Sequence, residues 1–213
     1  MGQLQQKLRR TAVAAGMAAY VLLAAGPARA VQLSPAIAQM YSAVEAVPPT
    51  ASQMMVCYGF VCRLRYFLYF TPADRAAIAG MMAKGAKSAA DERKALQQVF
   101  VWFDRRAGKA VGTDKRIARA DIRHRAADTN FDCFDTTRNA VSLLLVLREW
   151  GLLRHHTIED PRFRGNLFVG QTPHNTAVLK EKAGGKEWII DMWTTTYGQV
   201  PDVMTLEKWL DEN

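Results

Sequence analysis

The region from residue 133 to residue 193 constrains the fold most strongly, because it joins a helical pattern to a hairpin pattern. Small and apolar residues recur there at helical spacing, and Gly151 ends the run. The stripe comprises Cys133, Thr137, Ala140, Leu144 and Leu147, widened by Thr136 and Leu143. Residues 174–182 and 186–193 form two β-rich runs joined across a Gly-Gly turn. The region therefore predicts an α+β fold, with a buried Cys-bearing helix on a small antiparallel sheet.

Weaker signals outline the rest of the chain. Thr71-Pro72 is a helix start with an N-cap and a first-turn proline, and Ser88 with Asp91 starts another helix. These two N-terminal helices are expected to end near Lys84 and Arg106. The remaining expectations are a helical or irregular lead-in over 31–52, a strand or entry segment over 64–70, a short strand over 163–169 and a terminal helix over 206–210.

The first thirty residues have the three-part pattern of an export signal. A basic segment ends at Arg10, an uncharged apolar stretch follows over 11–25, and Ala28-Arg29-Ala30 is a small-x-small cleavage site. The apolar stretch has about 15 residues, whereas a membrane span needs about 20. We therefore expect a cleaved signal over 1–30 and one domain over 31–213, periplasmic or secreted, with no stable membrane span; an uncleaved anchor is the alternative.

Removing the signal changes the interpretation of the charge. The whole chain has 28 basic and 20 acidic residues, a net charge of +8, but four of the basic residues and no acid lie in 1–30. The mature net charge is therefore about +4, which is weak evidence for a nucleic-acid partner, and we expect none. The polar stretch 107–131 is either a solvated surface or a binding surface for an anionic envelope polymer.

The chain has three cysteines, of which two are expected to pair and one is left unpaired. Cys57 and Cys62 enclose a short glycine-containing loop, and export leads to an oxidising compartment, so we expect a disulfide between them. Two buried thiols or half of a metal site are the alternatives, although no second pair supplies further zinc ligands. Cys133 is left over and is either a reactive thiol or an inert buried one.

The residues Cys133, His174 and Asp191 suggest nucleophilic chemistry. Cys133 begins the predicted helix, where free N–H groups favour a thiolate, and a nearby imidazole oriented by a carboxylate can take the thiol proton. His174 begins one predicted strand and Asp191 ends the next. They face each other if Glu181 to Gly184 form the hairpin loop, with Lys180 opposite Gly185. The other histidines, His124, His155 and His156, are expected in loops or on the surface.

The Asn130-Phe131-Asp132-Cys133 helix start, His174 on an apolar strand and Asp191-Met192-Trp193 resemble the bacterial transglutaminase-like cysteine peptidases of the papain-like superfamily. The resemblance covers residues 130–198. It implies a papain-like or transglutaminase-like fold, with Cys133 as nucleophile, His174 as base and then acid, and Asp191 as orienting carboxylate. It also implies that the Cys133 backbone N–H and an upstream Gln or aromatic side chain bind the oxyanion. Gln98 and Trp102 are candidates for that second donor.

Three functions follow as hypotheses. The chain is an exported cysteine hydrolase that cleaves a peptide or isopeptide bond, an acyl transferase using the same site, or a non-catalytic envelope module that keeps the fold. The expected partner is a protein or a cell-envelope peptide, and we expect no metal and no cofactor. A redox role for Cys57 and Cys62 is a minor further alternative, because their spacing differs from Cys-x-x-Cys.

Overall fold

The computed structural model describes residues 31–212, and the predicted export signal lies outside the described residues. The fold is α+β, with helices and two small antiparallel sheets. The helices are α1 (Pro35–Ser42), α2 (Pro72–Ala83), α3 (Ala89–Val111), α4 (Cys133–Glu149) and α5 (Leu206–Asp211). The strands are β1 (Gln53–Tyr58), β2 (Leu64–Tyr69), β3 (His156–Arg164), β4 (His174–Glu181), β5 (Glu187–Asp191) and β6 (Asp202–Thr205).

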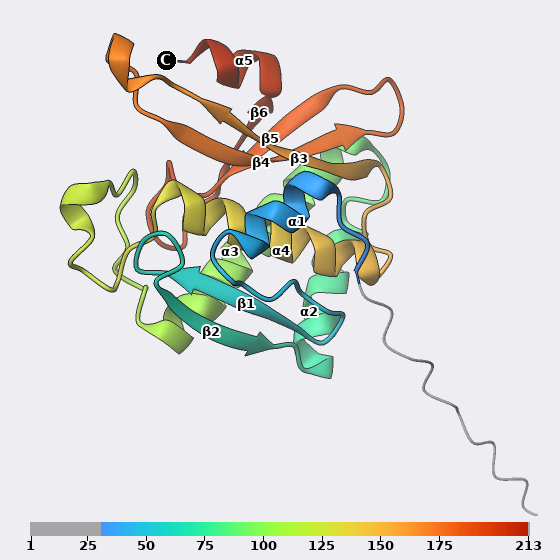
Figure 1. The fold of residues 1–213 in the computed structure, drawn as a ribbon. Helices are drawn as coiled ribbons and strands as arrows, with labels where there is room; N and C mark the ends of the chain where they lie inside the picture. The colour runs from blue at the N-terminus through green and yellow to red at the C-terminus, as the bar shows by residue number, and fades with distance from the viewer. Residues whose placement is uncertain (1–30, 213) are drawn as a thin grey trace, which may run out of the picture.

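Helix α4 is the centre of the molecule. It contacts β1 on one side and β4 on another, so it lies between the two sheets, and α5 covers the opposite face of the larger sheet (Figure 1). More of α4 is buried than the predicted apolar stripe indicates, because every residue from Asp135 to Leu147 is buried. A helix surrounded by protein needs no polar face, and its polar residues are instead hydrogen-bonded to neighbouring elements.

The predicted helix starts are confirmed. Thr71 and Asp74 form a reciprocal capping box at α2, and Ser88 caps α3 by accepting the Asp91 N–H. Helix α3 runs to Val111, beyond the predicted end near Arg106, and ends at Gly112, whose φ of 75° is left-handed. The extra turn is stabilised because Ala107 and Gly108 remain buried. The terminal helix α5 is also confirmed, and it begins at the cap Thr205.

The larger sheet has the order β3-β4-β5-β6, and its register differs from the predicted one. Lys180 pairs with Glu187, not with Gly185, so the predicted hairpin register is wrong by two residues. The turn is longer than predicted because Gly184 and Gly185 both adopt positive φ within it. Strand β3 overlaps the predicted 163–169 strand only at Phe163 and Arg164, and residues 167–169 form a 3-10 turn instead.

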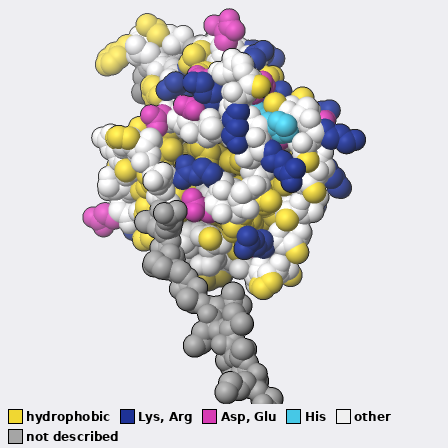
Figure 2. Space-filling model, turned by 90° about the vertical axis from the view of Figure 1, so that its right-hand side faces the viewer, with side chains coloured by type: hydrophobic (Ala, Val, Ile, Leu, Met, Phe, Trp, Pro, Cys, Tyr) yellow, Lys and Arg dark blue, Asp and Glu magenta, His cyan; other side chains and the backbone are white. Residues whose placement is uncertain are grey.

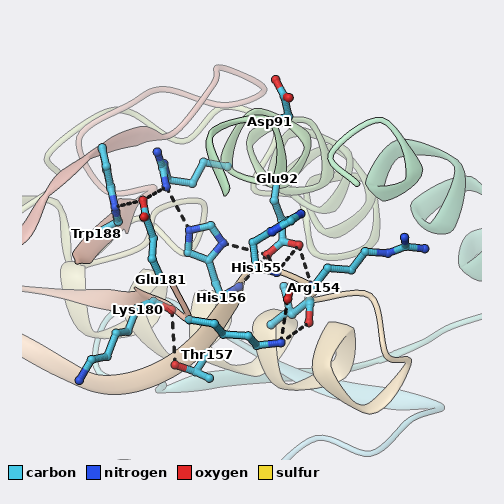
Figure 3. Close-up of polar contacts among 12 residues, drawn as sticks. Asp91, Glu92, Arg154, His155, His156, Thr157, Lys180, Glu181 and Trp188 are labelled. Carbon is cyan, nitrogen blue, oxygen red and sulfur yellow. Dashed lines mark hydrogen bonds and ion pairs between the residues drawn. The ribbon is translucent and has the colours of Figure 1, made fainter. Parts of the chain in front are cut away.

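A polar cluster ties α3 to β3 and β4 (Figure 3). The Glu92 carboxylate accepts hydrogen bonds from the backbone N–H groups of Arg154, His155 and His156, and from His156 Nδ1 at 2.8 Å. Arg93 donates to His156 Nε2 at 3.1 Å and to Glu181, and its guanidinium stacks on Trp188. His156 is 1% exposed, so its predicted place on the surface or in a loop is wrong.

Candidate active site

His174 and Asp191 form the charged pair of the candidate site. The imidazole Nε2 lies 2.5 Å from Asp191 Oδ2, and both side chains are buried. Because a carboxylate can only accept, Nε2 carries a proton, and in the neutral imidazole Nδ1 then holds the lone pair. Nδ1 is buried and has no hydrogen-bond partner. The predicted pairing of these two side chains is therefore confirmed, although their strand positions are not directly opposite.

Backbone and ring contacts hold this pair in place. The Trp193 N–H donates to the other Asp191 oxygen at 3.0 Å. The Trp193 ring centroid is 4.4 Å from that of His174, and the Trp209 centroid is 5.5 Å away on α5. The Trp193 indole N–H donates in turn to the Ala120 carbonyl. These contacts restrict the rotation of the imidazole and exclude water from the carboxylate.

The thiol of Cys133 lies next to β4, the strand that begins with His174. Cys133 is the first residue of α4, it is 8% exposed, and it is the free cysteine of the described chain. The backbone N–H groups of Asn175 and of Cys133 itself lie near enough to the sulfur to favour its ionised form, although burial outweighs them. One helical turn later, Thr137 Oγ1 donates to the Asn175 carbonyl at 2.9 Å. The start of α4 is thereby fixed to the peptide unit that follows His174.

No hydrogen bond joins Cys133 Sγ to His174 Nδ1, since that nitrogen has no partner. Side chains alternate along β4, so Ala177 and Leu179 join the core against α4, whereas Val178 joins the cluster under α5. His174 lies an even number of residues from Val178 and therefore on the same face of β4, which agrees with its contact to Trp209. The structure thus assembles the imidazole–carboxylate pair and brings the thiol to the adjacent peptide, but leaves thiol and imidazole unbonded.

The resting thiol is neutral. Burial raises the pKa of Cys133 to about 12, and the nearby negative charges of Asp132 and Asp191 oppose ionisation further. The sequence-based expectation of a stabilised thiolate at the helix N-terminus is therefore wrong. The main physical reason is burial of the thiol, and Asp132, the N-cap of α4, adds a carboxylate at the position that favours negative charge.

The disulfide loop is docked on the start of α4. Cys57 and Cys62 are bonded, as predicted, and Gly59 to Cys62 have consecutive positive φ values. Successive left-handed residues point their N–H groups the same way. Those of Phe60 and Cys62 donate to Asp135, and that of Val61 donates to Asp132.

These two carboxylates flank Cys133, so the disulfide loop fixes the helix start that carries the thiol. The spacing Asp132-x-x-Asp135 is a sequence signal of an N-cap followed by a first-turn acid. Sequence reasoning did not connect that signal to the disulfide loop.

A buried ion pair supports the other side of the site. Arg116 forms two hydrogen bonds of 2.9 Å to Asp104 on α3, and it also donates to the carbonyls of Met192 and Thr195. Arg116 thereby holds the segment that follows Asp191. This buried role shows that the polar stretch 107–131 is not simply a solvated surface.

Gln98 and Trp102 are not part of this site. Both line a cavity between α2 and α3, together with Met81, and Trp102 stacks on Phe70. A different cavity reaches His174, Trp193 and Thr194. The remaining histidines have structural contacts: His155 reaches the Ala86 carbonyl and His124 contacts Asp121.

Neither the protein-family models, the curated proteins nor the solved structures give a match to this chain. Within residues 31–212, no helix is long and apolar enough to cross a membrane, and no three acidic, His or Cys side chains are grouped to hold a metal ion. On one face of the molecule, Lys and Arg side chains are spread around hydrophobic ones and form no continuous patch (Figure 2).

Proposed function

We propose that the protein is an exported cysteine hydrolase of papain-like or transglutaminase-like type that cleaves an amide bond, with Cys133 as nucleophile. One observation carries the proposal: His174 Nε2 is committed to Asp191, while Nδ1 is buried and unpartnered. A neutral imidazole in that tautomer is ready to accept a proton. The Cys133 sulfur lies at the peptide N–H of the next residue, Asn175.

The reaction begins from a neutral thiol. Proton transfer requires the His174 imidazole to leave the position in which Trp193 and Trp209 hold it, so that Nδ1 reaches the sulfur when a substrate enters. Catalytic hydrogen bonds often form fully only in the complex. The thiol proton passes to Nδ1 as sulfur attacks the amide carbonyl. The imidazolium, stabilised by Asp191, then protonates the leaving amine, and water hydrolyses the resulting thioester.

Backbone groups replace the predicted oxyanion donors. The N–H groups of Cys133 and Asn175 both lie near the sulfur, so they are close to the carbon that sulfur attacks. We assign oxyanion binding to these two groups instead of Gln98 and Trp102. Removal of one oxyanion donor typically lowers kcat by about 10²–10³-fold.

The test is incubation of the protein with an envelope-protein fraction and cell-wall peptides, followed by mass spectrometry of new N-termini. New termini with the wild type and none with Cys133→Ala or His174→Gln support the hydrolase. The matched control is His155→Gln, which changes a histidine outside the site and is expected to remain active. Products that incorporate an added primary amine indicate acyl transfer, and unchanged substrates in every arm favour the non-catalytic module.

A further inference from the structure

The cavity that reaches His174 is lined by an excess of arginine. It has a volume of about 380 Å³ and its wall includes Arg119, Arg123 and Arg164. It lies where the 113–131 segment and the C-terminal end of the chain approach the start of β4. The carboxylates on its wall are Asp121 and Glu212.

These two carboxylates are already engaged. Asp121 accepts from the Arg123 backbone N–H and guanidinium, and those bonds hold the pKa of the Asp121 carboxyl well below its usual range. Glu212 lies 3.7 Å from Lys208 on α5. Glu212 also acts on Arg164, whose pKa its negative charge raises, so Arg119 is the arginine of this wall that no carboxylate among residues 31–212 balances.

Arg164 is held at the cavity wall by α5. Its guanidinium lies over the Trp209 ring, 4.2 Å from the centroid, and donates to the Trp209 carbonyl. Burial lowers the pKa of Arg164, and the positive charge of Arg119 lowers it further. The negative charges of Glu212 and Asp191 raise it. The two guanidiniums thus lie close enough to repel each other.

Arg119 has a free side chain on a constrained backbone. Its φ is 54°, in the left-handed region, and its N–H donates to the Trp193 carbonyl at 2.7 Å. Within the described chain its guanidinium has no hydrogen-bond or ion-pair partner. The left-handed backbone at Arg119 therefore places this exposed, unpaired guanidinium on the wall of the cavity that reaches the candidate base.

We propose that Arg119 and Arg164 bind a carboxylate of the substrate, so that the enzyme selects an amide bond next to an acidic group. The inference rests on the proposed hydrolase, because the cavity reaches the imidazole that serves the scissile bond. Paired guanidiniums match a carboxylate through charge-assisted, forked hydrogen bonds. The carboxylate belongs either to an Asp or Glu side chain or to a free C-terminus.

Binding is measured without turnover, in Cys133→Ala protein at low ionic strength, by calorimetry with three peptides. These are N-acetyl-Ala-Glu-Ala-amide, its Gln counterpart and N-acetyl-Ala-Ala-Ala with a free C-terminus. We expect one carboxylate peptide to bind about tenfold more tightly than the neutral Gln peptide, which is about 1.4 kcal/mol. Which of the two binds identifies the source of the carboxylate.

Variants locate the site. Arg119→Gln should abolish the preference and Arg119→Lys should keep part of it, whereas Arg125→Gln, an exposed arginine outside this cavity, should leave it intact. Equal affinity for the Glu, Gln and free-carboxylate peptides, or equal effects of Arg119→Gln and Arg125→Gln, would overturn the inference. Selective carboxylate binding by a protein that never acylates Cys133 would instead remove the proposed hydrolase and leave an anion-binding site.

Discussion

His174 and Asp191 are hydrogen-bonded through Nε2 and Oδ2 although the ladder pairs Ala177 with Ile190, which places the two residues diagonally across the hairpin. Diagonal neighbours on one sheet face are within reach of long or aromatic side chains. The contact therefore tolerates the two-residue difference between predicted and observed register. It leaves the Nδ1 lone pair of His174 free, which is the basis of the proposed chemistry.

Cys133 should react slowly in the folded protein. With the disulfide intact it is the chain's remaining thiol, and its pKa of about 12 compares with 9.0 in the unfolded chain. At pH 8 the thiolate fraction is thus roughly 10³-fold lower than after unfolding. Iodoacetamide labelling, followed by intact mass, should be correspondingly slower in buffer than in denaturant, and should accelerate with pH without a plateau below pH 9. A plateau near pH 6 would reveal a thiolate–imidazolium pair instead.

The same shift predicts a loss of stability in alkali. A group whose folded pKa is raised contributes stability fully below its unfolded pKa and loses that contribution as the pH rises toward the folded value. For Cys133 that window runs from about pH 9 to about pH 12. Urea unfolding of wild type and Cys133→Ala should therefore diverge in this window, with the wild type losing stability faster. Parallel curves would contradict the buried neutral thiol.

The contribution of Asp135 to the free energy of unfolding should fall as the pH rises from about 4 to about 7. Burial, aided by the charge of Asp132, raises the pKa of Asp135 from 3.8 to about 7. The folded state then binds more protons than the unfolded state between about pH 4 and 7, so this residue's contribution falls across that window. Asp135→Asn is expected to destabilise at all pH values, by about 1–3 kcal/mol, because its amide faces an N–H donor. Its deficit relative to wild type should shrink from pH 4 to pH 7 in urea titrations.

Glu92 should show the opposite pH dependence. Burial alone would raise its pKa, but the His156 hydrogen bond and the backbone N–H groups of His155 and Arg154 outweigh burial and hold the pKa below 4.5. Its contribution is present above about pH 4.5 and is lost as the pH falls through the folded pKa. Glu92→Gln should cost about 1–3 kcal/mol at pH 7 and less in acid. Thermal unfolding at pH 7 and pH 3 compares the two proteins.

Reduction of the Cys57–Cys62 disulfide should destabilise the protein by about 2 kcal/mol, from the loop-closure entropy of a short loop. The loop also donates to Asp132 and Asp135, so reduction should expose Cys133 to labelling as well. The matched control is Cys57→Ser with Cys62→Ser, treated with and without reductant, in which Cys133 labelling should no longer depend on the reductant. Unchanged labelling of the wild type after reduction would show that the carboxylates alone hold the loop.

Local sequence signals were sufficient to predict the helix starts and the Cys57–Cys62 disulfide. Caps at Thr71 and Ser88, the buried stripe from Cys133 and the Cys57–Cys62 spacing each depend on a few neighbouring residues, and the structure agrees with them. Strands β1 and β6 were not predicted, because their patterns are short and their partners determine them. The raised thiol pKa, the buried Arg116–Asp104 pair and the free Arg119 depend on contacts between residues distant in sequence, which periodicity does not reveal.

The most direct test of the central claim is rapid-quench mass spectrometry of the protein mixed with p-nitrophenyl acetate. The account predicts one acetyl group on the peptide containing Cys133, formed and then hydrolysed by the wild type. His174→Gln should acetylate at least about 10²-fold more slowly, since general-base catalysis contributes 10²–10⁴-fold, and His155→Gln should match the wild type. Acetylation of Cys133 at the same rate in wild type and His174→Gln would show that the imidazole does not activate the thiol, and the proposed mechanism would be wrong.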